Sequence, residues 1–147
     1  MATITCREAT EHDLTAIRDL IALLESHPDE VLTLEHLHVL FLTRPTTQTL
    51  YVAESDGVIV GTYTLNLIQQ WSHTGGRSVI VEDVAVSAVA QGQGVGRAMM
   101  HHAVEQARAL GCYKIVLSSA LHRESAHAFY DSLGYERHGV SFRLLLK

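Results

Sequence analysis

The sequence predicts a single α/β domain spanning residues 1–147, in which a mixed sheet carries helices on both faces. Hydrophobic residues make up 47% of the chain and charged residues 18%, which is enough apolar material for one packed core. Runs of strand length alternate with segments whose apolar residues recur at helical spacing. The second half reads strand, helix, strand, which predicts a βαβ unit behind an antiparallel front half. The predicted order is β-α-α-β-β-β-α-β-α-β.

The predicted elements follow from hydrophobic spacing and from residues that begin or end them. In chain order they are strand 2–7, helix 14–24, helix 33–42, strands 49–55, 58–68 and 78–86, helix 94–110, strand 113–119, helix 124–133 and strand 135–146. Thr10 and Asp13 resemble a capping box before the first helix, although the usual box carries Glu or Gln at the second position. Pro45 ends the second helix, and Gly111 and Gly134 stop the last two helices.

The strands are predicted from their side-chain patterns and from the turns that join them. Asp56-Gly57 between two apolar runs indicates a hairpin, because a type I′ turn requires positive φ at both central residues. The strand 78–86 is almost continuously apolar apart from Glu82 and Asp83. The last strand is expected to bend at Gly139.

Composition narrows the classes of protein. The formal net charge is −5, from 11 basic and 16 acidic residues, which argues against a nucleic-acid binder. A small anion can still bind, because a few backbone amides suffice. Cys6 and Cys112 are expected to be free thiols rather than a disulfide scaffold. No apolar run is long enough for a membrane span, and the first residues do not form an apolar signal stretch, so a cytoplasmic protein is expected.

A glycine loop, Gln91-Gly92-Gln93-Gly94-Val95-Gly96, lies between a predicted strand and a predicted helix. Glycine lets the main chain approach a ligand, and the first amides of a helix are unpaired at the positive end of its dipole. Together they predict a phosphate or diphosphate site, with Arg97 as a cation at its rim. The alternative is a flexible turn. A nucleotide P-loop would end in Gly-Lys-Ser or Gly-Lys-Thr, and a dinucleotide fingerprint has another glycine spacing.

Two motifs resemble those of the GNAT superfamily of N-acetyltransferases. Val84-Ala85-Val86 followed by Gln91-Gly92-Gln93-Gly94-Val95-Gly96-Arg97 resembles the motif that binds acetyl-CoA. The run Ala126-His127-Ala128-Phe129-Tyr130-Asp131-Ser132-Leu133-Gly134-Tyr135 resembles the second signature, an Ala-x-x-Phe-Tyr helix ending in Gly-Phe or Gly-Tyr. The resemblance covers essentially the whole chain and implies a GNAT-like fold, acetyl-CoA as cosubstrate and acetyl transfer to an amine.

Closer resemblances point to small amine substrates that carry a phosphorus oxyanion. The stretches 81–86 and 111–117 are similar to glucosamine-6-phosphate N-acetyltransferases. Leu117-Ser118-Ser119, followed by Arg123 and 126–130, is similar to aminoalkylphosphonate N-acetyltransferases. Many family members carry Asn seven residues before the tyrosine, where it contacts the pantetheine arm. This chain has Arg123 there, so that contact is not carried over.

Acyl transfer from a thioester to an amine requires a base, an oxyanion donor and an acid. The resemblance implies that the main chain of Val84 to Val86 binds the acetyl oxygen and the pantetheine, because this strand splays from its neighbour in the superfamily. It also implies that Tyr130 lies near the sulfur and protonates the departing thiolate. The alternative is that Tyr130 only packs against the coenzyme and bonds to it.

Glu82 is the leading candidate for the base that deprotonates the amine. On a regular strand it shares a face with Ile80, Val84 and Val86, where apolar neighbours would raise the pKa of its carboxyl group. The alternative is a carboxylate that orients the substrate or belongs to an interface. Asp83 is the second candidate for the base, because a β-bulge would exchange the faces.

The ten histidines give no strong zinc spacing, and no metal site is predicted. His101 and His102 are adjacent on a helix and point apart. His36 and His38 diverge in the same way. His122 and His127 are expected nearer the presumed site, where they could help to bind the substrate or to deprotonate it.

The acceptor is predicted to be a primary amine of a small molecule. Segments 27–44 and 69–77 lie where family members build the acceptor pocket, and Arg77 and Arg123 are the candidate cations for an acidic group on the acceptor. Two alternatives stay open: acetylation of a protein N-terminus or lysine, and a CoA-binding module without turnover. A homodimer is expected, since the last strand could cross to a partner sheet.

Overall fold

Five strands form one mixed sheet in the order β1-β2-β3-β4-β5 in the computed structural model, which describes residues 3–147. The chain divides into two units, Met1–Val116 and Leu117–Lys147. The main elements up to the end of the sheet are β1 (Ile4–Glu8), α1 (Leu14–Ala22), α2 (Leu34–Thr43), β2 (Gln48–Ser55), β3 (Val58–Gln69), β4 (Arg77–Val86), α3 (Val95–Ala109) and β5 (Cys112–Leu117). Strands β1 to β4 pair antiparallel with their neighbours. The predicted α/β class is confirmed.

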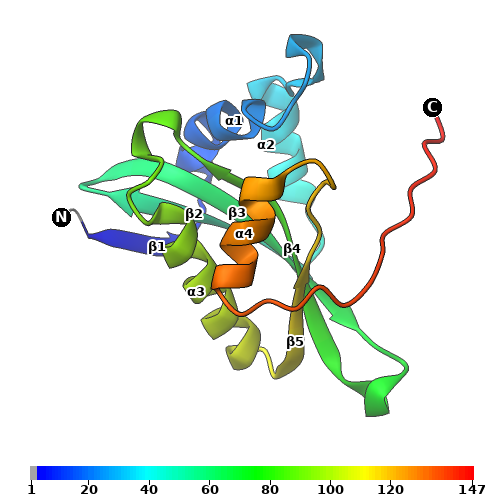
Figure 1. Ribbon diagram of the computed structural model, residues 1–147. Coiled ribbons are helices and arrows are strands. Elements are labelled where there is room, and N and C mark those ends of the chain that lie inside the picture. Colours follow the sequence, from blue (N-terminus) through cyan, green and yellow to red (C-terminus); the bar gives the residue numbers. More distant parts are fainter. Residues whose placement is uncertain (1–2) are drawn as a thin grey trace. The chain divides into compact units, whose positions relative to one another are not determined.

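Helices cover both faces of this sheet, α1 and α2 on one face and α3 on the other (Figure 1). Val52 belongs to the cluster beneath α1 and α2, and it pairs with Thr62, so Thr62 and Thr64 share that face. The intervening Tyr63 points to α3, where its hydroxyl lies 2.7 Å from His102 Nδ1.

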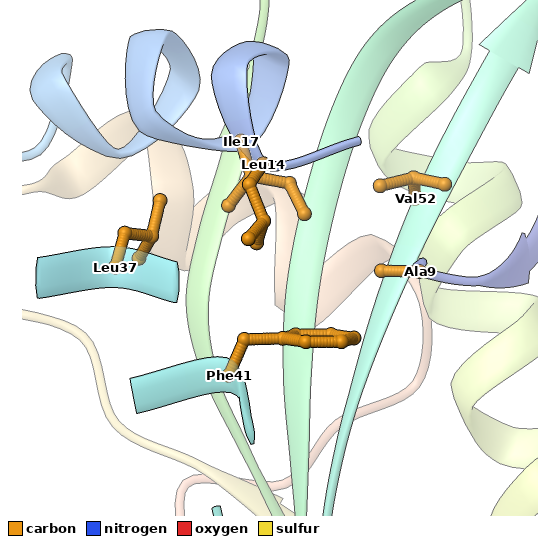
Figure 2. Packing of buried hydrophobic residues seen from close by; sticks show 6 residues of the cluster. All are labelled: Ala9, Leu14, Ile17, Leu37, Phe41 and Val52. Carbon is orange, nitrogen blue, oxygen red and sulfur yellow. The ribbon is translucent and has the colours of Figure 1, made fainter. Parts of the chain in front are cut away.

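The core on the first face is one hydrophobic cluster. Figure 2 shows its members, which are Ala9, Leu14, Ile17, Leu37, Phe41 and Val52. On the other face α3 buries an apolar stripe: Val95, Met99, Met100, Ala103 and Ala107. Among residues 3–147, no helix combines the length and the apolarity that crossing a membrane would require.

The β2–β3 hairpin turns at Asp56-Gly57, as predicted. Their φ angles are 52° and 77°, the left-handed pair that a type I′ turn needs. Ser55 and Val58 close the hairpin as paired residues.

The capping box before α1 forms with aspartate in place of the usual glutamate. The Thr10 backbone N–H donates to Asp13 Oδ2 at 2.7 Å. Arg7 binds both oxygens of the same carboxylate, at 2.7 and 2.8 Å, and its Nε donates to Glu54 Oε1 at 2.8 Å. The buried Asp13 side chain therefore joins β1 to the start of the helical layer, and these bonds, the Arg7 bonds foremost, lower its pKa to about 2.

Replacing Asp13 by asparagine is expected to lower the free energy of unfolding by about 2 kcal/mol at pH 7, because the shift from 3.8 to about 2 is worth that much. Since the folded-state pKa lies below the unfolded value, the wild type holds this stability above pH 3.8 and loses it as the pH falls toward 2. Urea unfolding from pH 7 down to pH 2 measures both effects. Asp19→Asn, at an exposed carboxylate, is the control. An equal loss in both variants would contradict the assignment.

The second unit contains α4 (Glu124–Ser132), which Gly134 ends with a φ of 88°. Beyond it, the predicted strand 135–146 is wrong, because the described chain has no strand after β5. Alternating apolar side chains are necessary for a strand, but a strand also needs a hydrogen-bonded neighbour. In this segment the large apolar side chains are exposed; they are Val140, Phe142, Leu144, Leu145 and Leu146.

Candidate active site

The glycine loop leads from the end of β4 into α3, at the place the sequence predicts. Gly92 and Gly94 have φ angles of 79° and 84°, which side chains other than glycine rarely adopt. Gly94 is the N-cap of α3. Both glycines are exposed, and a Cβ on either would meet no atom within 4 Å, so solvent reaches this side of the loop.

The first amides of α3 are free to bind a ligand. The first backbone hydrogen bond of the helix runs from the Ala98 N–H to the Gly94 carbonyl, at 3.0 Å. The amides of Val95, Gly96 and Arg97 precede that bond, and no acceptor for them occurs in residues 3–147. They lie at the positive end of a fifteen-residue helix, where the helix dipole favours negative charge. The Arg97 side chain is exposed beside it.

A β-bulge interrupts β4 just before the predicted acyl-binding residues. Thr64 pairs with Glu82 and Thr62 pairs with Ala85, so Asp83-Val84 lies opposite a single residue of β3. A bulge leaves its extra residue out of the hydrogen-bonded ladder and bends the strand. The main chain before Ala85 thus departs from the regular ladder with β3.

The bulge also corrects the predicted surroundings of Glu82. Cross-strand pairing places Glu82 on the same face as Ile80 and Ala85, which carries α1 and α2, whereas Val86 lies on the face of α3. The side chains of β4 do not alternate regularly between the two faces up to Val86, because Asp83 and Val84 together lie opposite one residue of β3. Glu82 is also exposed, so the apolar enclosure that the strand pattern suggested is absent.

Carboxylates from two distant segments, Glu25 with Glu30 and Asp83 at the bulge, interact with one another, and sequence reasoning missed this group. The pKa of Glu25 is raised, first by a hydrogen bond with Glu30 that favours the protonated form of Glu25, then by desolvation, and then by the charges of Glu30 and Asp83. Glu25 and Glu30 lie within the connection between α1 and α2, and Asp83 has a left-handed φ of 53° in β4. Their proximity makes this part of the first unit attractive to a cation. From the sequence, residues 27–44 were expected in the acceptor region, but no group of carboxylates was predicted there.

Tyr130 lies on α4 in the second unit. Its ring contacts those of Phe129 and Tyr135, with centroids 5.2 and 5.9 Å apart. Burial raises the pKa of its phenol above the ordinary value of 10, and the charge of Arg123 opposes this shift. The hydroxyl of Tyr130 therefore keeps its proton at neutral pH.

The remaining candidate residues have other positions. Arg77 is the first residue of β4, whereas the glycine loop lies beyond the other end of that strand. The Arg77 guanidinium lies beside Gly111. The His127 ring nitrogen is bonded to the Ala120 carbonyl at 2.8 Å, and His102 belongs to the α3 packing described above. Within the described residues, no three histidine, cysteine or acidic side chains form a group that could hold a metal ion.

Comparisons with known proteins identify relatives over most of the chain. The sequence profile described as "Acetyltransferase (GNAT) family" matches residues 12–135. A glucosamine 6-phosphate N-acetyltransferase from Trypanosoma brucei brucei is 39% identical over 89 residues, which is 60% of this chain and 58% of that protein. A probable glucosamine 6-phosphate N-acetyltransferase 2 from rice, Oryza sativa subsp. japonica, is 32% identical over 63% of this chain and 54% of its own. The matches thus span little more than half of these relatives.

Solved structures match over nearly the full length. The structure of a Trypanosoma brucei acetyltransferase aligns with 98% of this chain and 100% of its own, at 28% identity and a TM-score of 0.83. An Arabidopsis thaliana glucosamine-6-phosphate N-acetyltransferase, at 18% identity and a TM-score of 0.84, shares the fold. The predicted fold class is therefore confirmed both by the arrangement of the strands and helices and by the match to solved structures.

Proposed function

The chain belongs to the acetyltransferase (GNAT) family, and from this premise we propose that it moves an acetyl group from acetyl-CoA to a primary amine of a small molecule, by direct attack of the amine on the thioester. The observation that carries the proposal is the glycine loop with its free amides at Val95, Gly96 and Arg97. A diphosphate presents the negative charge and the acceptor oxygens that such a helix start binds. Gln91 adds an exposed side-chain amide to the loop, whereas the Gln93 side-chain amide donates to the Val89 carbonyl at 3.3 Å.

The acetyl group would lie along β4. The bulge at Asp83-Val84 frees backbone groups from the ladder, and an amide among Val84, Ala85 and Val86 can donate to the thioester oxygen. As the amine attacks, negative charge develops on that oxygen, and a fixed N–H dipole stabilises it more strongly than it stabilises the neutral carbonyl. We assign this backbone role to residues 84–86.

Proton transfer completes the reaction. An alkylammonium must lose a proton before it attacks, and the Glu82 carboxylate can accept that proton through a water molecule. Asp83 stays the second candidate, because it lies in the bulge itself. Tyr130 would return a proton to the thiolate of CoA as the tetrahedral intermediate collapses. Its raised pKa keeps the phenol protonated. Because a thiol has a lower pKa, about 8.5, transfer of the proton from the phenol to the thiolate is unfavourable unless the site assists it.

The acidic group around the bulge supports an amine acceptor. Glu25, Glu30 and Asp83 form a local concentration of negative charge that would attract an ammonium group. Because the trypanosome and rice relatives are named glucosamine 6-phosphate N-acetyltransferases, that amino sugar is the first acceptor to test. Arg123 is the candidate partner for its phosphate.

A thiol-release assay with acetyl-CoA tests the proposal against glucosamine 6-phosphate, unphosphorylated glucosamine, a polyamine and a lysine peptide. Turnover on a small amine is expected. Turnover on the peptide alone would favour a protein acetyltransferase. CoA binding without turnover on any acceptor would favour a binding module, and either of these results would contradict the proposed activity.

Glu82→Gln is expected to lower kcat/KM by roughly 100-fold, the usual contribution of a positioned base, while the Kd for CoA changes little. Asp83→Asn is the matched variant, since both changes remove one charge from neighbouring exposed residues. Steady-state kinetics and calorimetry measure the two quantities. A large loss in Asp83→Asn with a small one in Glu82→Gln would transfer the base role to Asp83.

We also propose a homodimer that forms through the C-terminal segment. Val140, Phe142, Leu144 and Leu146 repeat every second residue and are exposed, as in a strand that lacks a sheet. Light scattering on the wild type is expected to give twice the chain mass. Phe142→Ser is expected to shift the mass toward the monomer, whereas Arg143→Ser, at the adjacent position, is not. A monomeric wild type would contradict the proposal.

We propose the cytoplasm as the location of this activity. Cys6 and Cys112 are both free thiols, as expected in a reducing compartment where disulfides rarely persist.

A further inference from the structure

Two neighbouring residues of β3, Val60 and Gly61, anchor both ends of the glycine loop. Before the loop, the Ser87 N–H donates to the Val60 carbonyl at 2.8 Å. After the loop, the first turn of α3 packs directly over Gly61, where a Cβ would lie 2.9 Å from Val95 Cγ1 and 2.8 Å from Met99 Sδ. The segment from Ser87 to Val95, which contains most of the glycine loop, thus begins and ends on adjacent positions of one strand.

The glycine at position 61 serves this close approach and not the backbone conformation. Its φ lies outside the left-handed region, and it pairs with Ala53 on β2 and Val86 on β4, so the β2–β3 register shift falls at its neighbour Val60 and not at Gly61. Glycine weakens a strand interior and often marks a place where another segment comes near. Non-bonded carbon atoms normally stay about 3.5–4.0 Å apart, so any side chain at position 61 would push α3 away from the sheet.

The two neighbours differ in how they can respond. The Met99 side chain has several rotatable bonds and can swing away from an added methyl group. Val95 is β-branched, is buried and occupies the first residue of α3, so its side chain has little freedom in the helix. A methyl group at Gly61 would therefore move the backbone of Val95, whose amide is one of the three that precede the first helical hydrogen bond.

We infer that Gly61 is a positioning residue for the coenzyme: by lacking a side chain, it sets the height of the first turn of α3 over the sheet and so aims the amides of Val95, Gly96 and Arg97 at the diphosphate. The inference rests on the proposed function, because it takes those amides as the diphosphate site. Gly61 itself touches no ligand and acts through Val95.

A double-mutant cycle tests this coupling: Gly61→Ala, Val95→Ala and the combined variant, with calorimetric titration of CoA and thermal unfolding of each. Gly61→Ala is expected to raise the Kd for CoA about tenfold, because small displacements of binding groups are costly. Val95→Ala also weakens binding by leaving a gap. The combined variant refills the gap and returns to within about threefold of the wild type, a non-additive result. Additive losses would overturn the inference.

Ala107→Val is the matched control, because it adds volume to a buried position in the last turn of the same helix. It is expected to lower the unfolding temperature like Gly61→Ala without changing the Kd for CoA. If Gly61→Ala and Ala107→Val weaken CoA binding equally, Gly61 serves only the packing of α3, and the inference is wrong. In turnover, Gly61→Ala is expected to raise KM for acetyl-CoA while KM for the amine stays within about twofold.

Two outcomes separate the inference from the function it depends on. If Gly61→Ala does not fold, Val95→Ala can still be compared with the combined variant. The combined variant should bind CoA more tightly than Val95→Ala, because its added methyl group refills the gap. If it binds CoA no more tightly, the inference is overturned. A wild type that gives no heat with CoA contradicts the proposed function, and the inference with it. A wild type that binds CoA no more tightly than Gly61→Ala contradicts the inference alone.

Discussion

Replacing Gly94 by aspartate is expected to raise the Kd for CoA and acetyl-CoA at least 100-fold. The new carboxylate would stand at the N-cap of α3, among the amides that we assign to the diphosphate. Two unit charges about 4 Å apart repel by roughly 4 kcal/mol near a protein surface, and salt screening reduces this to the expected effect. Calorimetric titration measures the change directly.

Gly94→Asn separates charge from backbone strain. Asparagine and aspartate have nearly the same shape, and both visit the left-handed region more readily than other side chains. A Cβ at this position meets no atom within 4 Å, so both variants are expected to fold with a similar small loss of stability. Gly94→Asn should weaken binding by about tenfold or less. If both variants bind CoA like the wild type, the loop does not hold the diphosphate.

Features governed by local rules were predictable from the sequence. Asp56-Gly57 fixed the hairpin turn, and Gly92 and Gly94 adopt the positive φ angles for which glycine is suited. The start of α3 at Val95 follows from the same loop. In each case the residues that carry the signal also form the structure, so no distant partner decides the outcome.

Features governed by pairing between segments were not predictable. A bulge in 78–86 was considered only as the alternative that favours Asp83, because its presence and position depend on how β4 aligns with β3. The carboxylates of Glu25 and Glu30 come near Asp83 only through the packing of the whole first unit. The predicted strand 135–146 was wrong for the related reason that its pattern does not supply a neighbouring strand.

Gly61 belongs to the same class of missed signals. A glycine inside a predicted strand marks either a bulge or a close approach. The sequence alone does not name the approaching segment, which is α3. The position of the coenzyme loop thus depends on a residue thirty positions before it that carries no chemical group.

Replacing Tyr130 by phenylalanine is expected to lower kcat about 100-fold, within the usual range for loss of a general acid, and to leave the Kd for CoA within a few-fold of the wild type. The ring and its contacts with Phe129 and Tyr135 remain, so only the proton donor is lost. Steady-state kinetics and calorimetry measure the two quantities separately.

The pKa direction of Tyr130 adds a second measurement. Burial raises its pKa above 10, and a donor must be protonated to act, so a decline of kcat caused by this group is centred above about pH 10. If kcat of the wild type declines with rising pH around pH 8, another group must cause the decline, and Tyr130→Phe should show it as well. If such a decline instead vanished in the variant, the pKa direction or the assigned role would be wrong.

Tyr135→Phe is the control within the same unit, because burial also raises the pKa of the Tyr135 phenol and its ring contacts Tyr130. Two buried phenols thus offer similar packing, but only Tyr130 occupies the Phe-Tyr position of the helix signature. If the hydroxyl of Tyr130 protonates the thiolate, Tyr135→Phe should keep nearly full kcat. Equal losses in the two variants would mean that both hydroxyls support the packing of α4, and the acid would have to be sought in another residue or in water.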